Sequence, residues 1–130
     1  MHNFSDMSKF SIRKRIQSFK FAFNGIGRML KNEHNTWIHL FATVAVIGAG
    51  IWFNLSMPEW ICITFAIGLV FIAEGFNTAI EHLANAITLE KNELIKKAKD
   101  IAAGSVLIAA LVSVIIGLII FIPHIVKLFQ

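Results

Sequence analysis

Three long runs of apolar residues dominate the chain. Residues 37–53 are apolar apart from His39 and Thr43, residues 60–73 are almost wholly apolar, and residues 101–122 carry no charge. A helix needs about 20 such residues to cross the hydrocarbon core of a bilayer. Each run, extended by its flanks where it is short, therefore predicts a transmembrane helix. The predicted spans cover residues 34–54, 59–82 and 99–122.

A different pattern precedes the first run. Apolar residues recur there at helical spacing, with basic residues between them; the apolar members are Ile12, Ile16, Phe19, Phe23, Ile26 and Leu30. A helix with an aromatic face and a basic face lies in the membrane interface or packs against the spans of its own protein, and both can hold at once. We expect this amphipathic surface helix over about residues 9–32. The predicted fold class is thus all-α, an integral membrane protein with three transmembrane helices and an N-terminal amphipathic surface helix, in a single domain over residues 1–130.

Composition narrows the class of protein. Of the 130 residues, 56% are hydrophobic and 15% are charged, whereas a soluble domain carries roughly 25% charged residues. These proportions exclude a disordered chain, a nucleic-acid-binding module and a conventional water-soluble enzyme. The net charge of +4 therefore reports the topology of a membrane protein before it reports a ligand.

The basic residues predict how the spans are oriented. They gather before the first span and in the connection between the second and third spans, and the connection between the first two spans has none. The members are Lys9, Arg13, Lys14, Arg15, Lys20, Arg28 and Lys31 before the first span, and Lys91, Lys96, Lys97 and Lys99 in the second connection. By the positive-inside rule, the amino terminus and the second connection lie in the cytoplasm and the carboxyl terminus lies outside, with Lys127 as a minor exception. We expect a multi-pass protein of the plasma or inner membrane.

Two carboxylates and an amide occur where the second apolar run ends. Glu74, Asn77 and Glu81 share one face of a helix, because residues three and seven positions apart lie above one another. From the helical rise, Glu74 lies about 10 Å deeper in the membrane than Glu81. Ionisable side chains at that depth are costly and are by default functional or paired. The alternative, a polar stripe that only joins helices by hydrogen bonds, is less favoured for two carboxylates and an amide together.

Other polar residues belong at the same membrane boundary. Glu33 comes just before the first span, and Lys99 and Asp100 come just before the third. Glu33, Glu81 and Asp100 offer the hard oxygen ligands that Mg²⁺ takes together with substrate phosphates. Lys99 can act as a point charge on a phosphate. A metal, a cation and a carboxylate near a nucleophile are the components of phosphoryl transfer.

Each of these residues also has a simpler interpretation. Asp100 can cap the start of the third span, and Glu33 can be an ordinary interfacial charge. His34 and His82 can complete a metal site or remain solvated at the interface. His39, inside the first apolar run, is expected to hydrogen-bond to another helix.

Two functions of other classes compete with phosphoryl transfer. The first is a small proton- or cation-coupled transporter that uses the intramembrane Glu residues. A transporter needs its charges near the membrane midplane, whereas here they gather at one boundary beside Lys99. The second is a non-catalytic assembly subunit, in which the polar stripe only joins helices.

Two segments of the polar boundary form a specific pair. Residues 74–81 read EGFNTAIE, residues 98–107 read AKDIAAGSVL, and AFNG at 22–25 and Asn32-Glu33 lie upstream at matching spacing. Together these segments resemble the signature of the prokaryotic diacylglycerol kinase family, and the resemblance covers nearly the whole chain. It implies a small integral-membrane lipid kinase that uses ATP and Mg²⁺ on a lipid alcohol. It also implies a homotrimer of three-span subunits, with active sites shared between neighbouring subunits at the cytoplasmic boundary.

The resemblance implies roles for individual residues as well. Glu33 and Glu81 match the metal-binding carboxylates of the family. Glu74 matches the residue proposed as general base toward the lipid hydroxyl, and Asn77 accompanies it. The positions that match nucleotide-contacting residues are Lys99, Asp100, Glu93 and Lys14.

Departures from the family pattern bear on the substrate. Lys14 stands where the Gram-negative diacylglycerol kinases have Arg, and His39 stands where they carry Glu. The segments 35–40 and 121–123 look more like the branch that includes undecaprenol kinases. The lipid acceptor therefore stays open between diacylglycerol and undecaprenol.

Overall fold

The computed structural model describes residues 10–32 and 34–130. These residues form four α-helices and no strand, so the predicted all-α fold is confirmed. The helices are α1 (Ile12–Asn32), α2 (His34–Trp52), α3 (Met57–Ile87) and α4 (Glu93–Leu128). Helix α1 belongs to one compact unit, and α2, α3 and α4 form the other.

Helix α1 is amphipathic along its whole length. Its aromatic and aliphatic side chains, including Ile16, Phe19 and Phe23, are exposed. Its first turn is supported by Ser11, whose Oγ accepts a hydrogen bond from the backbone N of Lys14 at 3.4 Å. An exposed apolar face of this size needs a cover, and a basic amphipathic helix finds one in the headgroup region of a membrane.

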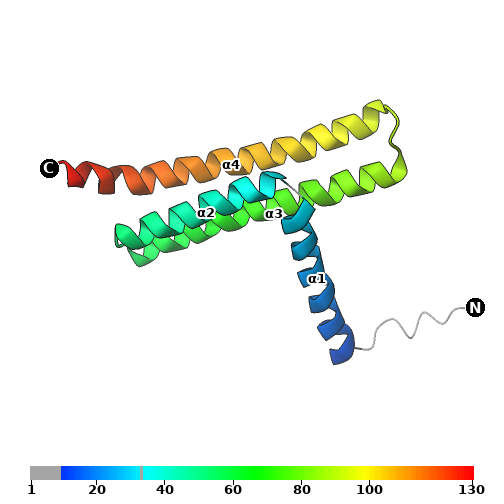
Figure 1. Cartoon of the computed structure of the whole chain (residues 1–130), viewed down its shortest axis with the longest axis horizontal. Helices are drawn as coiled ribbons and strands as arrows, with labels where there is room; N and C mark the ends of the chain where they lie inside the picture. Colours follow the sequence, from blue (N-terminus) through cyan, green and yellow to red (C-terminus); the bar gives the residue numbers. More distant parts are fainter. Residues whose placement is uncertain (1–9, 33) are drawn as a thin grey trace, which may run out of the picture. The chain divides into compact units, whose positions relative to one another are not determined.

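Helices α2, α3 and α4 are each long and apolar enough to cross a membrane. Helix α4 has 36 residues, so it is about 54 Å long, against a hydrocarbon core of about 30 Å. In the second unit, α2 and α4 both lie along α3, and the link between α3 and α4 is at the opposite end from the α2–α3 loop and the carboxyl terminus (Figure 1). We call the end formed by residues 81–100 the connection end, and the end formed by residues 53–59 and 121–128 the capped end.

The connection end is more helical than the sequence predicts. The sequence predicts a connection between a span that ends at residue 82 and one that begins at residue 99, but α3 continues to Ile87 and α4 already begins at Glu93. The loss of apolar character at His82 therefore does not mark the end of α3. Asn92 caps α4 in place of Asp100: its side-chain oxygen accepts from the backbone N of Leu94 at 3.0 Å and of Ile95 at 3.2 Å.

The capped end is held by side chains around the start of α3. Ser56 and Glu59 form a reciprocal capping box, in which the Glu59 carboxylate accepts from the Ser56 backbone N at 2.7 Å. Glu59 also contacts His124 of α4, with 2.9 Å between Oε1 and Nε2. Just before the cap, Asn54 has a φ of 53°, a left-handed conformation that Asn adopts more readily than most residues.

The apolar core of the second unit centres on α3. Ile63 of α3 packs with Leu55 of the α2–α3 loop and Ile120 of α4. Gly50 of α2 lies so close to Trp60 that a Cβ there would be 2.7 Å from the indole ring. The missing side chain at Gly50 thus lets α2 approach α3, as small residues do between membrane helices.

Candidate active site

The candidate site lies on the face of α3 that is buried in the second unit. Going along α3 from the capped end, this face consists first of Ile63, Ala66 and Val70, and then of Glu74 and Asn77. These residues recur at helical spacing, so the buried face changes from apolar to polar within one turn. The Glu74 side chain is 1% exposed and is among the most buried in the molecule. A carboxylate so placed costs free energy unless partners or a function compensate for it.

The polar part of this face leads toward the connection end. Asn77 is buried, and Glu81, one further turn along, is half-buried. The three residues predicted to form a stripe therefore run from the protein interior toward its polar end. His82, their neighbour in the sequence, is exposed.

Two hydroxyl residues that the sequence analysis did not single out are buried beside this face. Thr36 of α2 is 0% exposed, and Thr78 of α3 is buried next to Asn77. Within the described part of the chain, Thr36 Oγ1, Thr78 Oγ1 and Asn77 Oδ1 have no hydrogen-bond partner. Buried polar atoms are normally satisfied, so these three atoms offer hydrogen bonds to a ligand.

The register of α2 on α3 places Thr36 at the level of Glu74. His39 and Val70 line one pocket between these antiparallel helices. Thr36 is about one turn before His39 and Glu74 is about one turn after Val70, so both steps lead toward the connection end. The sequence signal for Thr36 is weak, because a single hydroxyl inside an apolar helix usually bonds to its own backbone.

Lys99 links α4 to α3 at the connection end. Its ammonium donates a hydrogen bond to Asn85 Oδ1 at 3.1 Å. This contact depends on the extra helical turn of α3 that carries Asn85. It holds a cation beside the end of the helix that also carries Glu81.

Asp100 and Glu93 lie on the exposed surface of α4. Asp100 forms an ion pair with Lys96 at 2.8 Å, one turn away on the same helix. Both side chains are more than 60% exposed, and such pairs contribute little to stability because water screens them. Glu93 is exposed in the first turn of α4, where a carboxylate interacts favourably with the helix dipole.

The metal ligands predicted from the sequence are described only in part. Glu33 lies outside the described residues, whereas Glu81 is described. Among the described residues no three His, Cys, Asp or Glu side chains are grouped so as to hold a metal ion. Glu81 and the unsatisfied Asn77 Oδ1 supply hard oxygen donors that suit Mg²⁺ better than a softer metal. His34 and Lys14 are exposed, Lys14 on α1.

Comparison with known proteins identifies the class. Residues 20–121 match the family model of the prokaryotic diacylglycerol kinases. The undecaprenol kinase of Bacillus subtilis is 42% identical over 112 residues, which are 86% of this chain and 91% of that protein. A diacylglycerol kinase of Synechocystis is 36% identical over 87% of this chain and 65% of its own length. The diacylglycerol kinase of Escherichia coli K12 is 31% identical over 64% of this chain and 68% of that protein.

The chain therefore belongs to the prokaryotic diacylglycerol kinase family. It is a lipid kinase, and its three long apolar helices make it a multi-pass membrane protein. The resemblance noted from the EGFNTAIE and AKDIAAGSVL segments is thereby confirmed.

Proposed function

We propose that this kinase transfers the γ-phosphoryl group of ATP to the hydroxyl group of a membrane lipid alcohol, with Glu74 as the general base. The observation that carries the proposal is the change from apolar to polar on the buried face of α3 at Glu74, in a helix long enough to span a membrane. A water-soluble substrate has no need of a carboxylate at that depth, whereas the headgroup of a lipid reaches it by lateral diffusion.

In the proposed reaction Glu74 removes the proton from the lipid hydroxyl as its oxygen attacks the γ-phosphorus. The bond between that phosphorus and the oxygen bridging it to the β-phosphate breaks, and ADP leaves with the electron pair. The products are the lipid phosphate, ADP and a proton on Glu74 that is later released to water. Thr36 and Asn77, with their unsatisfied oxygens, are suited to orient the lipid headgroup for this step.

The charged residues of the connection end are suited to hold the nucleotide. Lys99 lies against α3 at the connection end, where its ammonium group is available to a phosphate. Glu93 and Asp100 at the same end, and Lys14 of α1, are the other proposed nucleotide-binding residues, as the family resemblance implies. Exposure of these side chains is compatible with binding a soluble nucleotide from the aqueous side.

Glu81 and Glu33 are the proposed ligands of Mg²⁺. When bound, this ion would neutralise charge on the phosphates and favour departure of ADP. Glu81 is half-buried one turn beyond Asn77, so along α3 it comes between Glu74 and Asn85, the partner of Lys99.

For the acceptor we favour undecaprenol over diacylglycerol. The support is the undecaprenol kinase of Bacillus subtilis, which is 42% identical to this chain over 91% of its own length. The diacylglycerol kinases of Synechocystis and Escherichia coli are 36% and 31% identical.

We further propose that the protein works as a homotrimer with active sites shared between neighbouring subunits. Its amino terminus would lie in the cytoplasm and its carboxyl terminus outside.

Product identification tests the proposed function. The purified protein in lipid vesicles is given radiolabelled ATP and Mg²⁺ with undecaprenol, with dioleoylglycerol, or with neither. We expect undecaprenyl phosphate as the main labelled product. Preferential labelling of dioleoylglycerol would reverse the choice of acceptor, and no labelled lipid in either case would overturn the proposed reaction.

A further inference from the structure

His124 lies near the end of α4 and contacts residues at the ends of both other helices of the second unit. Its Nε2 is 2.9 Å from Oε1 of Glu59, in the first turn of α3. Its ring centre is 5.7 Å from that of Phe53, which directly follows α2. We call these two contacts the His124 clasp. They join the ends of three helices at the capped end.

The Glu59 carboxylate serves the cap of α3 and the His124 clasp at the same time. Its Oε2 accepts hydrogen bonds from the backbone N of Ser56 at 2.7 Å and from the Ser56 hydroxyl at 3.0 Å. Its Oε1 is left for His124. An ionised carboxylate only accepts hydrogen bonds, so all three contacts suit the charged form of Glu59. His124 therefore meets a negative charge that the start of α3 holds in place.

Both contacts of the clasp favour the charged form of the His124 ring. The Glu59 carboxylate attracts an imidazolium ion more strongly than a neutral imidazole. A cation within about 6 Å of the centre of an aromatic ring is also attracted by that ring, and Phe53 lies within this distance. The one other charged side chain among residues 53–59 and 121–128 is Lys127, which is exposed, and the last three turns of α2 carry none.

The His124 clasp is partly shielded from water but remains open to protons. The side chains of His124 and Glu59 are 21% and 28% exposed. An ion pair on the open surface contributes little, because water screens it, whereas a fully buried pair could not exchange protons with water. Histidine ordinarily changes its charge between about pH 5 and 8. The strength of the clasp should therefore depend on pH within this range.

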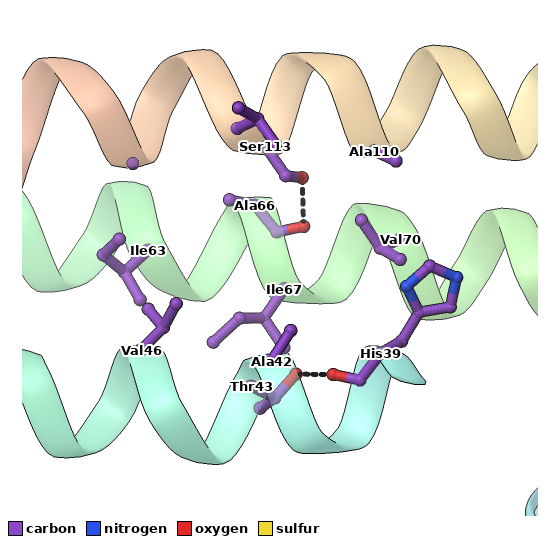
Figure 2. A pocket seen from close by; sticks show the side chains of 12 residues that line it. His39, Ala42, Thr43, Val46, Ile63, Ala66, Ile67, Val70, Ala110 and Ser113 are labelled. Atoms are coloured by element: carbon purple, nitrogen blue, oxygen red, sulfur yellow. Dashed lines mark hydrogen bonds between the residues drawn. The ribbon is translucent and has the colours of Figure 1, made fainter. Parts of the chain in front are cut away.

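Pro123 makes the end of α4 depend on the His124 clasp. A proline inside a helix has no N–H for the carbonyl group one turn before it, and the helix is weakened there. Before this point α4 is joined to α3 by Ser113, whose hydroxyl donates to Ala66 O at 2.9 Å (Figure 2). Among the described residues, the segment 123–128 has one side-chain hydrogen bond to another helix, that of His124 with Glu59.

We propose that His124 in its charged form holds the end of α4 beyond Pro123 against Phe53 and Glu59, and that loss of its proton loosens this segment. Because the folded structure favours the charged form, the added stability is present on the acid side of the titration of histidine and is lost as pH rises. In the proposed topology the capped end faces the outside, so the clasp would respond to external pH. The inference goes beyond the proposed reaction and does not depend on it.

Thermal unfolding of the purified protein in detergent, followed by circular dichroism, is the first test. His124→Gln keeps an N–H donor but cannot become charged, and Glu59→Gln removes the negative charge while Gln still closes the capping box. Between about pH 6 and about pH 9, we expect the wild-type Tm to fall by about 4 °C more than that of either variant. His82→Gln, at an exposed histidine of the connection end, is the matched control and should behave like the wild type. An equal fall for the wild type and His124→Gln would overturn the inference.

Distances between spin labels provide a second readout that does not depend on unfolding. In a Cys62→Ser background, Met57→Cys at the start of α3 and Leu128→Cys at the end of α4 place labels at exposed positions. In vesicles we expect a narrow distance distribution at about pH 6 and a broader one at about pH 9. Adding His124→Arg, which stays charged, should keep the distribution narrow at both values, and adding His124→Gln should make it broad at both.

Two outcomes of the distance measurement would contradict the clasp. The first is a distribution that is the same at both pH values when His124 is present. The second is a broadening with pH that persists in His124→Gln. A protein that phosphorylates no lipid alcohol would contradict the proposed function but would leave the reading of both experiments unchanged.

Discussion

At the scale of single residues, the buried face of α3 shows how a membrane protein can place an ionisable group for chemistry. Glu74 continues the same helical face that carries Ala66 and Val70. One turn separates a position that packs against other helices from one that holds a carboxylate. Because α3 is also the helix on which both neighbours pack, Glu74 is fixed by the best-packed part of the second unit. Such rigidity favours a proton-transfer residue, whose efficiency depends on its geometry.

Replacement of Glu74 tests its proposed role. We expect Glu74→Gln, which keeps the size and removes the basic carboxylate, to lower kcat by at least about a hundredfold. The reaction to measure is lipid phosphorylation in vesicles. Glu90→Gln serves as control, since Glu90 is exposed in the short link between α3 and α4. A Glu74→Gln protein with wild-type kcat would remove Glu74 from the mechanism.

Lys99 should act on the nucleotide rather than on the lipid. We expect Lys99→Met to raise the KM for ATP by about ten- to a hundredfold, because a hydrogen bond between charged groups is worth roughly 1.5–3 kcal/mol. The KM for the lipid should change little. Lys97→Met is the matched control, as Lys97 is exposed on the same helix. If both variants weaken ATP binding equally, general positive charge rather than Lys99 is responsible.

At the scale of helices, the close approach of α2 to α3 depends on Gly50. We expect Gly50→Ala to destabilise the protein by about 1–3 kcal/mol, because the added Cβ would lie 2.7 Å from Trp60. Gly48→Ala, with no atom within 4 Å of the added Cβ, should be neutral or slightly stabilising because Ala favours the helix. Unfolding in detergent followed by circular dichroism measures both. Equal stability of the two variants would show that α2 can move to accommodate the methyl group.

The pattern of apolar residues was enough to predict the helical class and the three long apolar helices, because helix formation and membrane insertion depend on local composition. The end of α3 was not predictable in this way. The residues after His82 are more polar than those before it, but they remain helical as far as Ile87. The extra turn of α3 carries Asn85, which accepts a hydrogen bond from Lys99 of α4. That contact joins residues 14 positions apart, which no local pattern specifies.

The candidate site was predictable to a similar extent. Glu74 and Asn77 stood out because polar residues are rare in an apolar run. Thr36 did not, since its significance depends on how α2 packs against α3. The pocket between α2, α3 and α4 could not be predicted for the same reason, because most of its lining residues are ordinary apolar residues until three helices bring them together.

At the scale of the whole molecule, the second unit presents a broad apolar surface. Large side chains such as Phe41, Phe65, Leu111 and Ile119 are each more than half exposed. In water this surface would cause aggregation, whereas in a membrane lipid can cover it. The charged residues of α3 and α4 gather instead at the connection end, apart from the buried Glu74 and from Glu59 and Lys127 at the capped end. This separation of charge is what a fixed orientation in the membrane requires.

The proposed orientation can be tested with single cysteines in a Cys62→Ser background. Glu90→Cys places a thiol in the α3–α4 link, and Gln130→Cys places one after α4. Because four lysines lie between residues 91 and 99 and only Lys127 lies at the capped end, we expect the link to face the cytoplasm. A membrane-impermeant maleimide added to intact cells should label Gln130→Cys, and it should label Glu90→Cys only after the cells are opened. The reverse pattern would place the proposed nucleotide site outside the cell, where no ATP pool could supply it, and would contradict the proposed topology and reaction together.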